Sequence, residues 1–417
     1  MKKALLAIAV VMLVAGTAFG SFTEYASLGG IPMQYTTTDQ VVTVYPSLIG
    51  DYSNQAVAEF GWDLWGYTMF DTEYGVFGLS ASPFPPMFNS GIGYGYLPDS
   101  AVGVQYGTEI DGMKVGASLL FGSEVESGIV TADGASEDNW TYGRHAIALN
   151  LGATIEGEMP IDLSLGVMNV SRWSIEEELY VSGNLDESYA SEAGGIGIAL
   201  NARTAIDSWL INLGFQFDTL SRTITNKETS ADDNVLTTHT ISTREDLEIS
   251  MNLGFAHVLK ATDTLTITMG SDLNFNTTSP YSTKTENLIA DTILYGPATR
   301  TVGFDVTIPI YVAVEGKLNE TWTVRGGVTS ILFDSDSRTN ESIDTDTGDV
   351  DETNYTYGSV ETDNGLVNGT IGVTGTFGDL TVDALLNPFI LLDGPYFISG
   401  SNNDLAVNIA VKYAWGN

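Results

Sequence analysis

Cysteine is absent from the 417-residue chain, so disulfides and thiolate metal sites are excluded. Basic residues are scarce: 16 lysines and arginines stand against 53 aspartates and glutamates, giving a formal net charge of −37. Nucleic-acid binding needs a basic footprint that this chain lacks. Such acidity instead suits surfaces that face water or cations.

Long apolar runs are missing beyond the N-terminus. Residues 1–20 (MKKALLAIAVVMLVAGTAFG) combine Lys2 and Lys3 with an apolar stretch and a small-residue end, which is typical of a cleaved signal peptide. The alternative is an uncleaved anchor. After this segment no apolar run approaches the roughly 20 residues that a transmembrane helix needs. We therefore expect an exported protein whose mature chain starts near Ser21.

Catalytic signals are few. The chain has three histidines and neither a Gly-x-Ser-x-Gly elbow, a metal-binding histidine pair nor a phosphate loop. We predict no enzyme, no catalytic residues and no cofactor. A barrel phospholipase or protease stays open as an alternative, because catalytic triads are recognised in space and not by sequence order.

What the chain has in quantity is two-residue alternation, the signature of β-strands with one apolar face. The C-terminal stretch DLAVNIAVKYAWGN (404–417) places Ile409, Val411 and Tyr413 on one face and Asn408 and Lys412 on the other. Similar runs fill most of the chain, with short turns at 111–112, 157–160, 207–208, 262–263, 318–320 and 378–379. Long polar stretches separate the hairpins at 86–100, 125–140, 174–192, 223–245, 277–300, 335–362 and 395–403.

Short turns on one side and long loops on the other predict an all-β, transmembrane, antiparallel up-and-down barrel with short periplasmic turns and long acidic extracellular loops. A phase shift near Asp63 in residues 56–70 is either a turn or a bulge. A turn gives about 16 strands, whereas a bulge leaves residues 40–45 as an extra strand or an inner element. We expect 14 to 16 strands, an even number because both edges must pair.

A wide soluble barrel is the alternative, but its apolar face would then have to fill a bore that in barrels of this size holds water or a plug. In the membrane interpretation the inward face carries the lumen charges Asp162, Arg203, Glu248, Asp272, Asp305, Arg325, Asp383 and Lys412. Aromatic residues near short turns or the C-terminus suit membrane–water interfaces, and the predicted anchors are Trp209, Trp322, Tyr413 and Trp415. We expect the protein in the bacterial outer membrane, in contact with its lipid, and expect Trp415 to be recognised by the barrel insertion machinery.

The N-terminal stretch 25–62 carries Gly29-Gly30, then Thr38-Asp39, then Tyr45-Pro46-Ser47-Leu48. In this order of elements it resembles the long-chain fatty acid transporter (FadL-like) family of outer-membrane barrels and its secretion-associated relatives. Tyr45 and Ser47 depart from that family's Asn-Pro-Ala motif. The resemblance implies that residues 21–55 form a lumenal plug, with Gly29, Gly30 and Pro46 as plug positions, inside a barrel formed by 56–417. The alternative is a periplasmic tail or an ordinary first strand.

The strongest charge run, 334–354, offers Asp344, Asp346, Asp349 and Asp351, whose oxygens are ligands that Ca²⁺ prefers. Their spacing does not match an EF-hand, so a solvated loop tip is the simpler interpretation and the Ca²⁺ site a weak candidate.

Three functions remain open. The first is a channel or transporter for small hydrophobic molecules, with Phe84, Met87, Phe88 and Tyr94 of an apolar loop as candidate substrate-binding residues. The same side chains could instead only cap the barrel rim. The second is a general diffusion porin with cation preference, because inward carboxylates outnumber inward cations. The third is a non-transporting surface barrel that acts as a scaffold, adhesin or secretion partner.

Overall fold

The computed structural model describes residues 22–29, 31–36, 38–60, 65–82, 97–98, 101–131, 136–180, 185–229, 236–278, 282–287, 292–295, 299–343, 350–356, 360–361, 368–386 and 406–416. The expected signal peptide lies outside these residues. No helix within them is long and apolar enough to cross a membrane.

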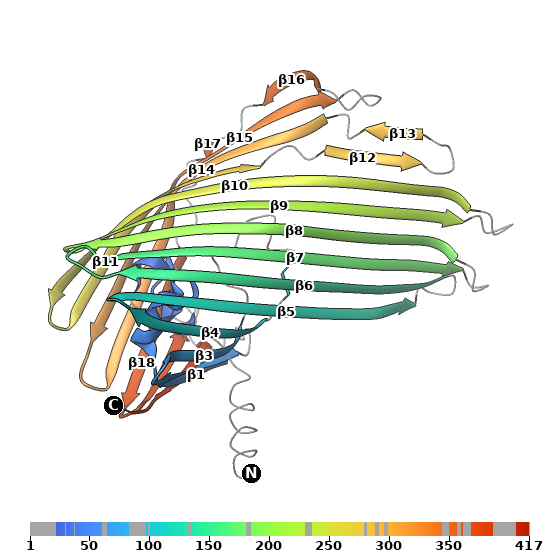
Figure 1. Ribbon diagram of the computed structural model, residues 1–417. Helices are drawn as coiled ribbons and strands as arrows, with labels where there is room; N and C mark the ends of the chain where they lie inside the picture. Colours follow the sequence, from blue (N-terminus) through green and yellow to red (C-terminus); the bar gives the residue numbers. More distant parts are fainter. Residues whose placement is uncertain are drawn as a thin grey trace, which may run out of the picture.

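The described strands close into an antiparallel β-barrel (Figure 1). Each wall strand pairs with the next along the chain, and the first pairs with the last, from Gln55 opposite Ala414 to Phe60 opposite Ile409. Sixteen strands form the wall: β1 (Gln55–Phe60), β2 (Trp65–Thr72), β3 (Gly75–Ser82), β4 (Ala101–Ile110), β5 (Met113–Thr131), β6 (Ser136–Ile155), β7 (Ile161–Tyr180), β8 (Leu185–Ile206), β9 (Trp209–Thr229), β10 (Leu236–Thr262), β11 (Leu265–Thr278), β14 (Thr299–Lys317), β15 (Trp322–Ile343), β18 (Asn368–Phe377), β19 (Leu380–Leu386) and β20 (Ala406–Ala414).

Four more strands lengthen the wall at the end away from the short turns. β12 (Ser282–Asn287) continues β11 along β10 and pairs with β13 (Thr292–Tyr295). β16 (Val350–Thr356) and β17 (Val360–Glu361) continue β18 along β15.

The expected barrel and the upper strand number are confirmed. β1 and β2 are separate strands that pair antiparallel, Gln55 opposite Met69, so the phase shift falls between two strands of the wall; Asp63 itself lies outside the described residues. Residues 40–45 form no strand. Instead, 39–43 form a 3₁₀-helix in the barrel interior.

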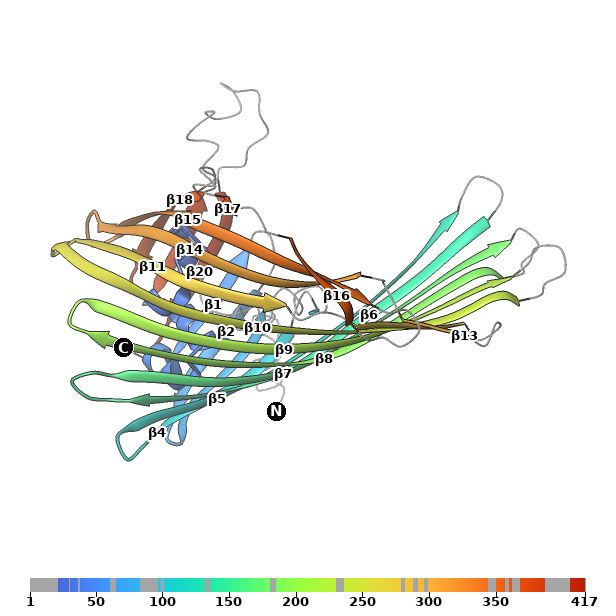
Figure 2. The same cartoon turned by 90° about the horizontal axis from the view of Figure 1, so that it is seen from above.

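The wall is uneven in height (Figure 2). β5 to β10 run for 19 to 27 residues, whereas β1 to β4 and β18 to β20 run for 6 to 10. The long strands continue through parts of the stretches that we expected to be loops, such as 125–131, 174–180 and 236–245. These predicted boundaries were wrong because charged and hydroxyl side chains interrupt the alternation there, which weakens the signal.

The two faces of the wall differ as the alternation predicts. Leu213, Leu253 and Phe255 on neighbouring long strands are all about half exposed, at 51–52%. Asn212, which directly precedes Leu213 in β9, is buried on the inner face. At the short-turn end, Asp111 and Gly112 both have positive φ, 51° and 79°, as a two-residue hairpin turn requires.

Candidate functional site: the barrel lumen and its inner segment

Residues 22–29, 31–36 and 38–54, together called the inner segment below, lie inside the barrel near its short-turn end (Figures 1 and 2). They form four short helical turns: α2 (Phe22–Ser27), η1 (Met33–Tyr35), η2 (Asp39–Thr43) and η3 (Pro46–Tyr52). Val42, Tyr45 and Ile49 have no exposed surface. Apolar burial therefore fixes this segment against the wall, although it contains no strand.

Glycines on the inner face of the wall allow the backbone of the inner segment to approach closely. A Cβ atom at Gly116 would collide with the Pro46 carbonyl, and one at Gly327 would collide with the carbonyl of Leu28. A glycine is needed wherever two backbones come this near. We call the inward glycines the six wall positions at which a Cβ would collide with the inner segment. At Gly116, Gly152 and Gly327 it would meet backbone atoms, and at Gly107, Gly254 and Gly372 it would meet side chains.

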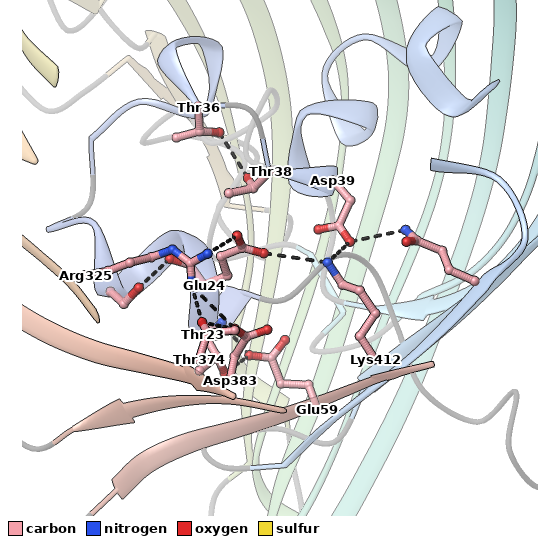
Figure 3. A network of polar contacts seen from close by, with 12 residues as sticks. Thr23, Glu24, Thr36, Thr38, Asp39, Glu59, Arg325, Thr374, Asp383 and Lys412 are labelled. Carbon is pink, nitrogen blue, oxygen red and sulfur yellow. Dashed lines mark hydrogen bonds and ion pairs between the residues drawn. The ribbon is translucent and has the colours of Figure 1, made fainter. Parts of the chain in front are cut away.

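Arg325 on β15 is the first charged anchor of the inner segment (Figure 3). Its Nη2 lies 2.8 Å from the Oε1 of Glu24, and its Nε donates a 2.6 Å hydrogen bond to Glu315. Its Nη1 approaches Asp383 at 3.4 Å and donates to Thr374. A guanidinium with only 10% side-chain exposure is stable here because several oxygens share its charge.

Lys412 on β20 is the second anchor, between two carboxylates of the inner segment (Figure 3). Its Nζ lies 2.9 Å from the Oδ2 of Asp39 and 3.6 Å from the Oε2 of Glu24. The same Oδ2 accepts hydrogen bonds from Tyr67 and, at 3.2 Å, from Gln55. Three wall residues thus meet one buried carboxylate.

The two carboxyl groups respond differently to burial. Burial outweighs the nearby Lys412 and Arg325 charges and raises the pKa of Glu24. For Asp39 burial acts in the same direction, but Lys412 and the hydrogen bonds from Tyr67 and Gln55 outweigh it and lower the pKa. Asp39 therefore stabilises the docked segment above its ordinary pKa, and this contribution is lost as the pH falls through the lowered value.

A third anchor joins η1 to β11, which is separated from β15 only by β14. Tyr35 donates a 2.5 Å hydrogen bond to Asp272 on β11 and packs against Tyr311, with ring centroids 5.6 Å apart. Its hydroxyl lies over Gly254, where any Cβ would displace it. In η3, the Ser47 hydroxyl oxygen lies 2.8 Å from the hydroxyl oxygen of Thr154 on β6.

Above the inner segment the lumen wall is apolar along its tall side. One continuous hydrophobic cluster joins inner-segment residues such as Val42 and Ile49 to buried side chains of neighbouring strands. These are Leu120 on β5, Ala146 and Ala148 on β6, Met168 and Val170 on β7, Ala193 and Ala199 on β8, and Leu220 on β9.

Six of the eight predicted lumen charges lie in the barrel interior, where each contacts the inner segment or another of the six. Arg203 donates a 2.6 Å hydrogen bond to Asp162 and another, at 3.1 Å, to the Gln34 carbonyl. Asp272, Arg325, Asp383 and Lys412 belong to the anchors above. Glu248 is buried higher on the inner face, and the partly buried Asp305 lies opposite Asp336.

The candidate plug positions also contact the wall. Gly29 has a φ of 83°, and its carbonyl accepts a 2.6 Å hydrogen bond from Thr329. Pro46 lies over Gly116 and Gly152. Gly30 lies outside the described residues.

The predicted interfacial anchors lie at the short-turn end. Trp209 and Trp322 begin β9 and β15 and are 46% and 42% exposed. Tyr413 stacks on Trp415, whose backbone N–H bonds to the Asn54 carbonyl at 2.9 Å.

Other predicted site residues are outside the description. They are Phe84, Met87, Phe88 and Tyr94 of the candidate substrate loop and Asp344, Asp346 and Asp349 of the candidate Ca²⁺ loop. Asp351 is on β16, but its side chain is not among those described. Among the described residues no group of three or more carboxylates and histidines is arranged to hold a metal ion.

Comparison with family models and with curated proteins finds no match for this chain. Solved structures that share part of its shape include the toluene transporter TodX of Pseudomonas putida, at 11% identity, covering 94% of this chain and 96% of that one, with a TM-score of 0.42. The toluene transporter TbuX of Ralstonia pickettii is 11% identical, with 94% of this chain and 97% of that one covered and a TM-score of 0.40. The monoaromatic hydrocarbon channel CymD is 10% identical, with 97% of this chain and 99% of that one covered and a TM-score of 0.38. Scores below 0.5 assign neither family nor function, so the proposals below use this chain's own geometry.

We predict that Gly116→Leu displaces η3, because the new side chain would occupy the space of the Pro46 carbonyl. Overpacking of this kind costs about 1–3 kcal/mol. Limited digestion with chymotrypsin should then cleave the inner segment at least about tenfold faster than in the wild type. Gly157→Leu is the control, since nothing lies within 4 Å of a Cβ there. Equal protection of the two variants would contradict the docked position.

A second prediction compares two lysines that each form an ion pair with the inner segment. Lys114 binds Asp51, which is 45% exposed, at 2.8 Å, and Lys412 binds the fully buried Asp39 at 2.9 Å. Lys412→Met should destabilise the docked segment by about 3–5 kcal/mol, because a buried carboxylate loses its partner. Lys114→Met should cost less than about 1 kcal/mol. Chemical denaturation monitored by chymotrypsin protection measures both, and equal losses would show that the buried pair is not an anchor.

Proposed function

We propose that the protein is an outer-membrane barrel. In hydrocarbon every backbone polar group must pair within the protein, which a closed barrel achieves. The exposed apolar belt on the outer face supports this, together with the aromatic anchors at the short-turn end. On this proposal the short turns face the periplasm, the long strands rise towards the cell exterior, and the N-terminal signal peptide directs export.

Within that membrane the barrel serves as a channel or transporter for small hydrophobic molecules. The observation that carries this proposal is the hydrophobic cluster on the inner wall from Leu120 to Leu220. A barrel that conducts water-soluble solutes has a polar interior. An apolar stretch of inner wall, whose side chains are 0–8% exposed in this structure, is instead suited to a ligand with apolar surface of its own.

The inner segment acts as the plug of this lumen. Its close approach to the inward glycines, and its buried anchors at Arg325, Lys412 and Asp272, support a specific docked state. A plug held in this way argues against a general diffusion porin. No specific observation on the described residues favours the third alternative, a non-transporting surface scaffold.

Uptake of N-phenylnaphthylamine tests the proposal, because intact lipopolysaccharide membranes exclude this hydrophobic dye. Cells with the barrel should take up the dye several-fold faster than cells without it. Met168→Glu should remove most of this gain, because it places an ionised carboxylate in the apolar lumen wall.

The matched control is Gln216→Glu, which puts the same group on the inner face of β9 outside the cluster. Dye uptake equal in the presence and absence of the barrel would reject the proposal. Equal effects of the two variants would reject the role of the apolar wall.

A further inference from the structure

The tall wall, formed by the long strands β5 to β10, is bordered on one side by β5 (Figure 1). β5 pairs with β6 along its whole length, as far as Thr131 opposite Glu137. Its pairing with β4 stops lower, where Phe121 lies opposite Val102. Among the described residues, 122–131 therefore have a neighbouring strand on one side only. We call residues 122–131 the β5 edge.

The described part of the chain that leads into β4, Leu97 and Pro98, does not follow the β5 edge. Leu97 packs against the hydrophobic cluster of the lumen, and its carbonyl accepts a 3.0 Å hydrogen bond from Arg144 on β6. Arg144 is opposite Glu124 of the β5 edge. At this height Leu97 thus lies over the inner face of the wall and not beside β5.

The β5 edge has the regular form of an interior strand. Proteins usually protect an open edge with proline, lysine or a bulge. The stretch GSEVESGIVT (122–131) contains neither proline nor lysine, and its register with β6 shows no shift. Val125, on the outer face, is 59% exposed. The backbone N–H and C=O groups on the open side can therefore pair with a further strand.

The charged side chains of the β5 edge are two carboxylates on its inner face. Glu124 lies 3.7 Å from Arg144, and Glu126 accepts a 2.6 Å hydrogen bond from Tyr142. Each carboxylate has two oxygens and can accept further hydrogen bonds. Since Glu124 and Glu126 are two residues apart, two basic side chains at the same spacing on an added strand would lie opposite them. An acidic strand would be repelled.

A second copy of this chain is a poor partner for the β5 edge. Barrels in one membrane share one orientation, so the β5 strands of two copies run in the same direction and cannot pair antiparallel. Their tilt, about 35–45° in such barrels, makes the two strands cross. Glu124 and Glu126 of the two copies add like-charge repulsion. These features favour a different chain as the partner.

We propose that the β5 edge is a docking site for an extended basic segment of another protein, which adds one antiparallel strand to the tall wall. Main-chain hydrogen bonds supply the affinity of such a contact, and side chains at alternate positions supply its specificity. Basic side chains of the segment face Glu124 and Glu126, and the net charge of −37 attracts the segment from a distance. This partner surface goes beyond the proposed function and depends on it only for the shared orientation of the barrels.

The test uses a fluorescein-labelled synthetic peptide that alternates lysine with valine. Its binding to the full-length barrel in phosphatidylcholine nanodiscs is measured by fluorescence anisotropy, with empty nanodiscs subtracted. A peptide that alternates glutamate with valine should bind at least about tenfold more weakly, because its charge is reversed. The lysine peptide with methylated amide nitrogens keeps its charge but has no backbone donors, and it should also bind at least about tenfold more weakly.

A pair of double variants separates the edge from general electrostatic attraction. Val125→Lys with Glu126→Lys puts two lysines on the β5 edge and should weaken binding of the lysine peptide at least about tenfold. Ile175→Lys with Glu176→Lys is the matched control, because it makes the same change in charge on β7, which pairs with β6 and β8. The control should weaken binding less than about threefold, since salt screens charges that are not in contact.

Hydrogen exchange locates the bound peptide. Amides within 122–131 should become protected when the lysine peptide is added. Amides within 161–170 of β7 should not change, because that strand has a neighbour on each side.

Equal affinities of the edge variant and the β7 control, or of the methylated and unmethylated peptides, would overturn the proposal. Protection of 122–131 that rises with barrel concentration in the absence of peptide would identify a second copy as the occupant and would overturn it as well. The edge variant should admit N-phenylnaphthylamine at the wild-type rate, because the β5 edge contributes no residue to the hydrophobic cluster. Dye exclusion by the wild-type barrel would count against the proposed function, so the two proposals fail in separate assays.

Discussion

The close approach of two backbones inside the barrel determines the rest of this structure. The inner segment lies against the wall because Gly116, Gly152 and Gly327 let its backbone approach, while Gly107, Gly254 and Gly372 leave room for its side chains. Without that approach, Glu24 would not reach Arg325, and Asp39 would not reach the Lys412 ammonium and the Tyr67 hydroxyl. The two ion pairs join residues far apart in the sequence, and the hydrogen bond from Thr329 to the Gly29 carbonyl likewise spans 300 residues. The glycines thus allow an otherwise irregular segment to acquire one defined position.

Once the inner segment occupies the short-turn end, the remaining lumen has an ordered chemistry. The apolar wall from Leu120 to Leu220 begins at the inner segment. Four arginines follow it in lateral register on the same wall, Arg144 on β6, Arg172 on β7, Arg222 on β9 and Arg244 on β10, and the long-loop end lies beyond.

The sequence was sufficient for the barrel, because period-two alternation and short turns are local signals. It predicted the outward position of Tyr413, the inward position of Asn408 and the turn at Asp111-Gly112. It failed for strand ends above the apolar belt, where charged and hydroxyl side chains interrupt the alternation. Apolar side chains in a strand do not always mark its outer face. Tyr67 and Met69 of β2 are apolar but buried on the inner face, in one cluster with the inner segment.

The lateral register of these four arginines on β6 to β10 could not be predicted from the sequence either. Arg222 and Arg244 lie at the edge of, or within, a stretch that looked like a loop, and only long-range register brings the four arginines into one line. Register between strands depends on the whole closed barrel. The inward glycines did carry a signal, since glycine within an alternating run indicates close backbone approach. What approaches each glycine could not be identified from the sequence.

The most direct test of the central claim is a disulfide between the inner segment and the wall. The Ser47 and Thr154 hydroxyl oxygens are 2.8 Å apart, and the chain has no native cysteine. Ser47→Cys combined with Thr154→Cys should cross-link on mild oxidation of intact outer membranes, which non-reducing peptide mapping would detect. Absence of the cross-link, with both cysteines instead free to react with maleimide, would contradict a docked inner segment.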